Sequence, residues 1–285
     1  MAIDAVLNAG KVLEEYFENK NYRITYKSKS GKGSPVTDAD IESNKILMER
    51  IRLAFPDDGW LSEETVDDQA RLEKERIWIV DPLDGTEEFL EGFPMFSISL
   101  ALVENKVPVI GVVYNPVSKE LYFGVKGEGA YMLKGEELNG VFPDEQELQN
   151  FLIKSKNYPS TLDGATVILS RKEVNNVKLI KALAEKFKNV KYAGGIAYKI
   201  VSVAGGFADA VVSVYNKSEW DLAGAHIIAE EAGLKVTDSY GKSLHYNERE
   251  VKRKGVIVAN ESLHGEILKF IRGSTESNDN KIWEL

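Results

Sequence analysis

The chain has 285 residues, of which 43% are hydrophobic and 28% charged, a composition typical of a globular protein that buries a core without disulfide or metal staples. Cysteine is absent, which excludes disulfides, thiolate metal sites and thiol nucleophiles and leaves oxygen-rich sites for hard cations. The net charge of −9 argues against a nucleic-acid polymer as partner, because such a partner needs a basic face. No signal-peptide pattern opens the chain and no stretch approaches the roughly 18 apolar residues of a membrane span, so we predict a cytoplasmic protein with no membrane partner.

Two helices are predicted before the first strands. Residues 3–18 carry apolar side chains at three- to four-residue spacing, which indicates an amphipathic helix. Residues 27–35 are rich in glycine and serine and are predicted to form a flexible loop able to move over a site. A second helix is expected to begin at Thr37, with Asp40 completing a variant capping box, and to end before Pro56.

A strand-rich region follows. The apolar strand 77–80 runs directly into an acidic turn, after which residues 85–90 have the character of a helix start. The next strands are joined by polar or glycine turns and are predicted to form an antiparallel sheet; they are residues 96–103, 107–114, 121–125 and 130–133. Residues 134–163 are polar and show little periodicity, so they mark a boundary or an inserted loop.

In the second half of the chain helices and strands alternate, which predicts layers of both. The predicted strands are residues 166–169, 208–214, 234–237 and 255–258, and the predicted helices are residues 174–188, 196–206 and 221–232. We therefore divide the chain into an N-terminal α+β half with the acidic motifs (1–140), a loop or insertion (141–163), a C-terminal α/β half (164–272) and a flexible tail (273–285).

The acidic turn is the first candidate site. Asp81 and Asp84 stand three residues apart at the end of an apolar strand, so their carboxylates and the Leu83 carbonyl are able to converge on one Mg²⁺ ion. Gly85 and Thr86 open the next helix, whose free N–H groups suit a phosphate. A bare turn of this kind is more often only a turn, so its neighbours decide the interpretation.

Acidic residues before and after this turn in the sequence have structural explanations as well as functional ones. Glu63 and Glu64 follow a short apolar segment, and Glu219 and Asp221 stand at the start of a helix rich in alanine and glycine. Glu64 and Glu219 are expected to be solvated, and Asp221 would be a favourable acid in a first helical turn. Asp40 would merely complete its helix cap.

Four separated motifs together resemble the inositol monophosphatase superfamily, which includes 3′(2′),5′-bisphosphate nucleotidases and some fructose-1,6-bisphosphatases. The motifs are Pro35-Val-Thr-Asp-Ala-Asp40, Leu61-Ser-Glu-Glu64, Trp78-Ile-Val-Asp-Pro-Leu-Asp-Gly-Thr86 and Trp220-Asp-Leu-Ala-Gly224. Their order and spacing match over roughly residues 5–270. The resemblance implies an α/β fold, a layered α-β-α-β-α sandwich, with the site between its halves, and hydrolysis of a small-molecule phosphate monoester.

The resemblance also implies a ligand set and a set of catalytic residues. A first Mg²⁺ would be held by Glu63, Asp81 and the Leu83 carbonyl, a second by Asp81, Asp84 and Asp221, and a third, weaker ion by Asp40 through water. Gly85 and Thr86 would hold the phosphate, and Thr86 with Glu63 would orient and deprotonate the attacking water. The resemblance also predicts inhibition by Li⁺. Members of this superfamily are often homodimers, so a homodimer is one candidate assembly, but the sequence itself indicates no interface.

The substrate is less clear from the sequence. Several residues resemble the bacterial nucleotidase branch, and we predict that they bind the substrate. They are Glu88, Ser170, Arg171, Gly195 and Lys199. Against it, Glu87 matches neither branch, Ile196 replaces an expected serine, and Glu173 would repel a second phosphate if it faced the pocket.

Several alternatives stay open at this point. The lead substrate is 3′-phosphoadenosine 5′-phosphate, followed by inositol 1-phosphate and then fructose 1,6-bisphosphate. The acidic residue with which inositol phosphatases grip substrate hydroxyls is replaced by Val214, which weakens the second reading. A tolerant pocket for several small phosphates is a further alternative, and a non-catalytic regulatory binding protein is the alternative of another class.

Overall fold

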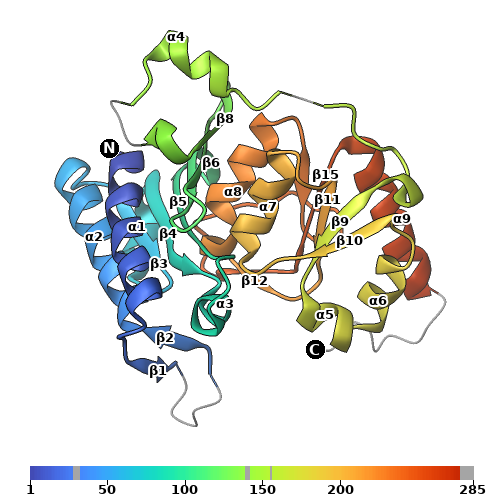
Figure 1. Ribbon diagram of the computed structural model, residues 1–285, viewed down its shortest axis with the longest axis horizontal. Coiled ribbons are helices and arrows are strands. Elements are labelled where there is room, and N and C mark those ends of the chain that lie inside the picture. Colours follow the sequence, from blue (N-terminus) through green and yellow to red (C-terminus); the bar gives the residue numbers. More distant parts are fainter. Residues whose placement is uncertain (28–32, 139–141, 155, 277–285) are drawn as a thin grey trace.

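The computed structural model describes residues 1–27, 33–138, 142–154 and 156–276. Figure 1 shows them arranged in successive layers: two helices, a six-stranded sheet, two central helices, a five-stranded sheet and an outer group of helices. Clusters of buried apolar side chains fill the spaces between these layers. The predicted α-β-α-β-α sandwich is therefore confirmed.

The first outer layer consists of α1 (Ala2–Asn19) and α2 (Asp38–Ala54). Their apolar faces pack against the first sheet, with Leu13 fully buried. The predicted capping box is present at the start of α2: the Thr37 hydroxyl accepts a hydrogen bond from the Asp40 N–H, and the Asp40 carboxylate accepts one from the Thr37 N–H. This cap fixes the position of the Asp40 carboxylate.

The first sheet has the strand order β3-β4-β5-β6-β7-β8. Its strands are β3 (Gly59–Ser62), β4 (Arg76–Asp84), β5 (Ser97–Glu104), β6 (Val107–Asn115), β7 (Glu120–Val125) and β8 (Gly129–Lys134). β3 and β4 are parallel, and the other neighbours are antiparallel. The four predicted antiparallel strands are confirmed, whereas β3 is too short to show a periodic pattern in the sequence.

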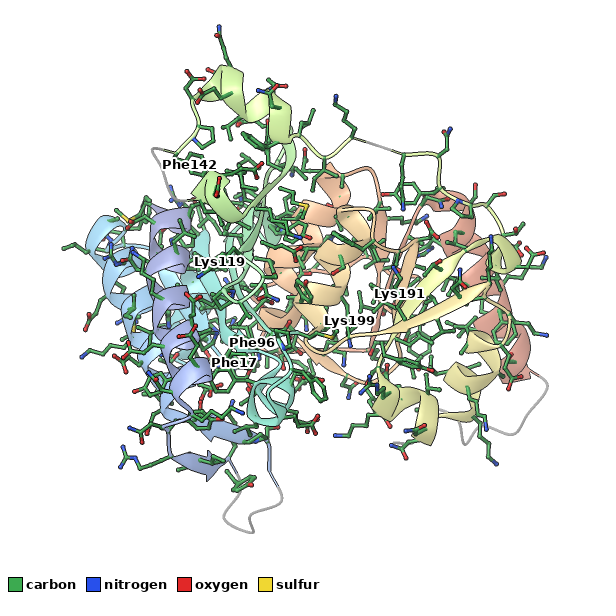
Figure 2. All side chains as sticks on the ribbon, in the orientation of Figure 1. Phe17, Phe96, Lys119, Phe142, Lys191 and Lys199 are labelled. Atoms are coloured by element: carbon green, nitrogen blue, oxygen red, sulfur yellow. The ribbon has the colours of Figure 1, made fainter. Side chains whose placement is uncertain are left out.

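An aromatic cluster holds the short helix that follows β4, α3 (Thr86–Glu91). The ring centroid of Phe89 lies 5.1 Å from that of Phe96 and 5.7 Å from that of Phe17. Figure 2 shows Phe17 and Phe96 next to each other, with centroids 5.1 Å apart. Such pairs contribute about 0.5–1.5 kcal/mol each beyond simple burial, so they stabilise the turn that precedes α3.

The central layer is formed by α7 (Ile196–Ala204) and α8 (Glu219–Glu231), which lie between the two sheets (Figure 1). Apolar residues cover nearly all sides of both helices, as expected for helices buried on two faces. α8 approaches the first sheet closely, because a Cβ atom at Gly111 would lie 2.1 Å from the Gly224 carbonyl oxygen. Only glycine permits this contact.

The second sheet has the order β10-β9-β11-β15-β13. Its strands are β10 (Asn189–Tyr192), β9 (Thr166–Leu169), β11 (Ala210–Ser213), β15 (Val256–Ala259) and β13 (Lys235–Thr237), and the outer helices are α5 (Arg171–Asn176), α6 (Lys178–Ala184) and α9 (Glu261–Glu276). Within the described ranges, no helix has both the length and the apolar character needed to cross a membrane.

One predicted helix needs correction, whereas the predicted division into domains stays a prediction. The helix predicted for residues 174–188 is split into α5 and α6, because Val177 is extended (φ −112°, ψ 106°). The segment 134–163 contains the short helix α4 (Glu145–Leu148). The expected tail begins inside α9, which continues to Glu276; residues 277–285 lie outside the described residues.

The predicted loop 27–35 is described only at its ends. The strands β1 (Ile24–Tyr26) and β2 (Pro35–Thr37) pair as an antiparallel ladder on either side of it. Residues 28–32, on which the prediction of a flexible loop mainly falls, lie outside the described residues.

Candidate active site

Two acidic side chains converge because β3 and β4 are parallel and in register. Ser62 is paired with Val80, so the next residues, Glu63 just after β3 and Asp81 within β4, lie side by side. The Glu63 N–H donates to the Val80 carbonyl at 3.2 Å, which continues the pairing beyond β3. Residues that are distant in sequence are thus neighbours at one edge of the fold.

The start of α8 supplies a third carboxylate. The Oδ2 atom of Asp221 accepts a hydrogen bond from the Ser218 N–H at 2.6 Å, in a capping box that fixes its side chain. Carboxylate oxygens of Glu63, Asp81 and Asp221 lie within 4.8 Å of one another, close enough to share a metal ion. We call these three residues the acidic cluster.

Burial makes the acidic cluster unfavourable unless a positive charge compensates. Burial raises the pKa of Asp81 well above its ordinary value, and the charges of Glu63, Asp84 and Asp221 raise it further. Burial also raises the pKa of Asp221 to about 6, with a contribution from Glu63. Convergent carboxylate oxygens are the ligands that Mg²⁺ prefers, so the cluster fits a divalent ion.

Asp84 is directed toward α7. Its carboxylate accepts hydrogen bonds from the first N–H groups of that helix, those of Ile196 (2.8 Å), Ala197 (2.8 Å) and Tyr198 (3.3 Å). Burial and the charge of Asp221 nevertheless raise the pKa of Asp84 to about 7. Within the described residues Asp84 does not belong to the acidic cluster, so its role as a metal ligand stays a prediction.

The predicted catalytic threonine is paired with Asp40. Thr86 Oγ1 lies 3.1 Å from Asp40 Oδ1 and 3.2 Å from the Leu83 carbonyl oxygen, and its single proton is donated to one of them. The other oxygen of Asp40 accepts hydrogen bonds from the Thr37 N–H and hydroxyl at 2.7 and 2.6 Å. Burial still raises the pKa of Asp40. These contacts connect the helix cap of α2 to the metal turn.

One cavity of about 240 Å³ collects most of the predicted residues. Those that line it are Glu63, Asp81, Leu83, Asp84, Gly85, Thr86, Glu88, Gly195, Lys199 and Asp221. Lys199 belongs to α7, in the middle of the molecule, as Figure 2 shows, and is 5% exposed. Burial, followed by the charge of Lys217, lowers the pKa of Lys199 to about 8.

The structure does not bring Ser170 and Arg171 to this cavity, whose lining among the described residues contains neither. Ser170 follows β9 and precedes α5. The exposed guanidinium of Arg171 lies 5.8 Å from the centre of the Tyr192 ring. The role of Ser170 and Arg171 in substrate binding stays a prediction.

Glu173, which would repel a second phosphate if it faced the cavity, is not among the described residues that line it. It is buried, and its Oε1 atom accepts hydrogen bonds from the Ser213 hydroxyl (2.8 Å) and from the N–H groups of Val214 (3.0 Å) and Tyr215 (2.8 Å). The side chain therefore caps the end of β11, and it is not part of the cavity lining.

Glu219 was expected to be solvated and is instead fully buried. Its carboxylate accepts hydrogen bonds from the N–H groups of Asn247 (2.7 Å) and Glu248 (3.0 Å) and forms an ion pair with Arg253. These partners satisfy the charge and attach the start of α8, which carries Asp221, to the loop that precedes β14 (Lys252–Arg253).

Two lysines at the site were missed by the sequence analysis. Lys27 Nζ lies 2.5 Å from Glu63 Oε1 and 2.8 Å from Glu64 Oε1, and Glu64 is consequently not solvated as expected, with 6% of its side chain exposed. Lys217, in β12 (Lys217–Ser218), lines the cavity. The one available signal for Lys217 was its nearness in sequence to Asp221; nothing in the sequence indicated the contacts of Lys27.

Comparison with known proteins places this arrangement in a family. The sequence matches the inositol monophosphatase family over residues 1–276. It is 33% identical over 250 residues to an inositol monophosphatase of Mesembryanthemum crystallinum, covering 85% of each chain. It is also 33% identical over 244 residues to the 3′(2′),5′-bisphosphate nucleotidase CysQ of Salmonella typhimurium, covering 85% of this chain and 91% of the relative.

The solved structures agree with the sequence comparison. An inositol monophosphatase of Thermotoga maritima matches with a TM-score of 0.78 at 28% identity and covers 96% of both chains. The family consists of metal-dependent phosphatases, and the acidic cluster supplies the oxygen ligands that such an enzyme requires. The chain belongs to the inositol monophosphatase family and is a phosphatase that hydrolyses small phosphate monoesters.

Proposed function

We propose that this enzyme uses Mg²⁺ to hydrolyse a small phosphate ester by direct attack of water, with 3′-phosphoadenosine 5′-phosphate as its lead substrate. The observation that carries the metal assignment is the acidic cluster, in which three carboxylates meet within 4.8 Å. Glu63, Asp81 and Asp221 would hold the principal ions with the Leu83 carbonyl and Asp84. Asp40 is the candidate for a third, weaker ion.

Bound Mg²⁺ would polarise the phosphoryl group, lower the pKa of the attacking water and stabilise the leaving oxygen. The protein's own contribution is to position that water. Because Thr86 donates its single proton to Asp40 or to the Leu83 carbonyl, its oxygen is free to accept a hydrogen bond from the water. Water then forms the new P–O bond as the ester bond breaks, and protonation of the leaving oxygen yields an alcohol and inorganic phosphate.

Three features support the nucleotidase substrate. Lys199 is a buried cation in the cavity, and Glu88 and Gly195 line the same space. The Glu173 carboxylate, which would oppose a second phosphate if it faced the cavity, does not line it and accepts hydrogen bonds at the end of β11. One relative at 33% identity is named a bisphosphate nucleotidase. Inositol 1-phosphate is the second candidate because other relatives at similar identity are named inositol monophosphatases, and fructose 1,6-bisphosphate is the third.

Phosphate release tests both the chemistry and the substrate. We expect Mg²⁺-dependent release, inhibited by Li⁺, with the highest kcat/KM for 3′-phosphoadenosine 5′-phosphate among the three candidates. A tenfold or greater preference for inositol 1-phosphate would overturn the lead substrate. Absence of release from all three at millimolar Mg²⁺ would contradict the proposed reaction.

Asp81→Asn should abolish turnover while the protein stays folded. Asp81 is fully enclosed in the acidic cluster, and an amide removes both a ligand charge and much of the mutual repulsion. We expect at least about a thousandfold loss in kcat, of the order seen when a transition-state charge loses its stabilising partner, with an unchanged circular dichroism spectrum. Full activity of this variant would refute the metal assignment.

A further inference from the structure

The cavity is lined by groups of both charges. The acidic cluster and two lysines, Lys199 from α7 and Lys217 from β12, line the same cavity. β12 is held in place by antiparallel pairing with β14, in which Lys217 is opposite Arg253. Both ammonium groups therefore come from ordered backbone positions on different elements.

In the part of the chain that the structure describes, neither ammonium group has a hydrogen-bond or ion-pair partner; the hydrogen bonds of Lys199 and Lys217 there are those of the backbone. Lys199 is 95% buried, and a buried charge is normally paired because desolvation is costly. Elsewhere in the molecule the buried Glu219 follows this rule with Arg253. Among the described residues the two lysines have no such partner, and an anionic ligand would supply one.

The electrostatic repulsion between the two lysines also favours binding of an anion. Burial and the charge of Lys217 lower the pKa of Lys199 to about 8, and the carboxylates of Asp84, Glu173 and Glu88 offset this only in part. An anion placed between the two ammonium groups would remove their repulsion.

We propose that Lys217 and Lys199 together form a subsite for a second anionic group of the substrate, and that Lys217 is the residue with which this chain selects phosphate esters that carry two anions. This inference rests on the proposed function, since the other anion is the phosphate that is hydrolysed at the acidic cluster. The ligand class is a compact ester with a second phosphate. A substrate with a single phosphate would place no second anion beside the two lysines.

A pair of nucleotides isolates this contribution. 3′-Phosphoadenosine 5′-phosphate and adenosine 3′-phosphate share the scissile group and differ only in the 5′-phosphate, so the ratio of their kcat/KM values measures what the second anion contributes. We expect the wild-type ratio to fall by about 10- to 100-fold in Lys217→Met, the range for a lost charged contact. Lys217→Arg should retain most of the ratio, and added salt should lower it in the wild type.

The control and the possible outcomes keep the two proposals separate. Lys235→Met removes the same charge from a surface ion pair with Glu261 and should keep the wild-type ratio. An equal loss for both nucleotides in Lys217→Met would show that Lys217 acts through Asp221 and would overturn the subsite; an unchanged ratio would overturn it as well. If the wild type hydrolyses neither nucleotide, the proposed substrate fails, and calorimetric binding of the two nucleotides to wild type and Lys217→Met still tests the subsite.

Discussion

At the scale of single residues, Lys27 competes with a metal ion for the carboxylate of Glu63. Its ammonium lies 2.5 Å from Glu63 and 2.8 Å from Glu64, so an ion that uses Glu63 as a ligand must first separate this pair. About one third of the Lys27 side chain is exposed (32%), which limits the strength of the contact. The ion pair is therefore a modest competitor for the metal.

Replacement of Lys27 should accordingly strengthen metal binding. In Lys27→Met we expect the Mg²⁺ concentration for half-saturation, measured by calorimetry without substrate, to fall by about two- to fivefold, the equivalent of a partly exposed ion pair. Lys45→Met is the matched control, because Lys45 pairs with Glu49 on the surface of α2. Unchanged or weaker binding in Lys27→Met would contradict the competition.

The difference between predicted and missed site residues has a simple physical cause. Asp81, Leu83, Asp84, Gly85 and Thr86 were recognisable because one turn holds them together, whatever the rest of the chain does. The contacts of the two lysines depend on how distant elements pack, and no local pattern encodes them. Burial of Glu219 and Glu173 was unpredictable for the same reason.

At the scale of elements, the contact between the metal turn and α7 depends on the absence of a side chain. A Cβ atom at Gly195, the residue before α7, would lie 2.2 Å from Asp84 Oδ2 and 2.6 Å from the Asp84 carbonyl oxygen. Such a distance is far below van der Waals contact, and both groups that would have to move belong to the turn. Glycine at this position allows the carboxylate of Asp84 to reach the first N–H groups of the helix.

Gly195→Ala should therefore damage stability and activity together. We expect a loss of about 1–3 kcal/mol in the free energy of unfolding, as for other overpacked sites, and a lower kcat because Asp84 and the turn are displaced. Urea denaturation and phosphate release measure the two effects. Gly265→Ala in α9 is the control: no atom lies within 4 Å of the added Cβ, so alanine should be neutral or stabilising. Equal stability of the two variants would refute the steric argument.

At the scale of the whole molecule, the sandwich was predictable and its details were not. Alternating strands in residues 96–133 and the helix patterns at 196–206 and 221–232 gave the layers, because burial on one face or on all sides leaves a regular apolar pattern. β10 and β3 lacked such a pattern and are defined by their strand partners. The split between α5 and α6 depends on one residue's backbone conformation.

Protonation of the acidic residues links the site to global stability. Burial raises the pKa of Asp84 to about 7 and of Asp221 to about 6, so the metal-free folded state binds protons that the unfolded chain has already released. The contribution of these groups to stability is therefore lost as the pH rises from about 4 to about 7. Burial lowers the pKa of His264 to about 4. Its contribution to stability is therefore lost as the pH falls below the ordinary pKa of histidine, the opposite direction to that of the two carboxyl groups.

Mg²⁺ should reverse this loss. Because the ion binds ionised carboxylates, we expect the rise in Tm on adding Mg²⁺ to be larger at about pH 8 than at about pH 5.5. Thermal scans with and without the ion at both pH values measure the difference, and His264 affects both members of each pair equally. A rise in Tm that is the same at both pH values would contradict the coupling.

The hydrogen bond between Asp84 and Ile196 spans 112 residues of sequence. Contacts this remote form only after a long segment of chain has been closed, whereas the hairpins of β5 to β8 close over short turns. The N-terminal sheet is thus able to assemble before the second half of the chain has folded onto it. The contact between Asp84 and α7 exists only once α7 has docked, so enzymatic competence should not precede that docking.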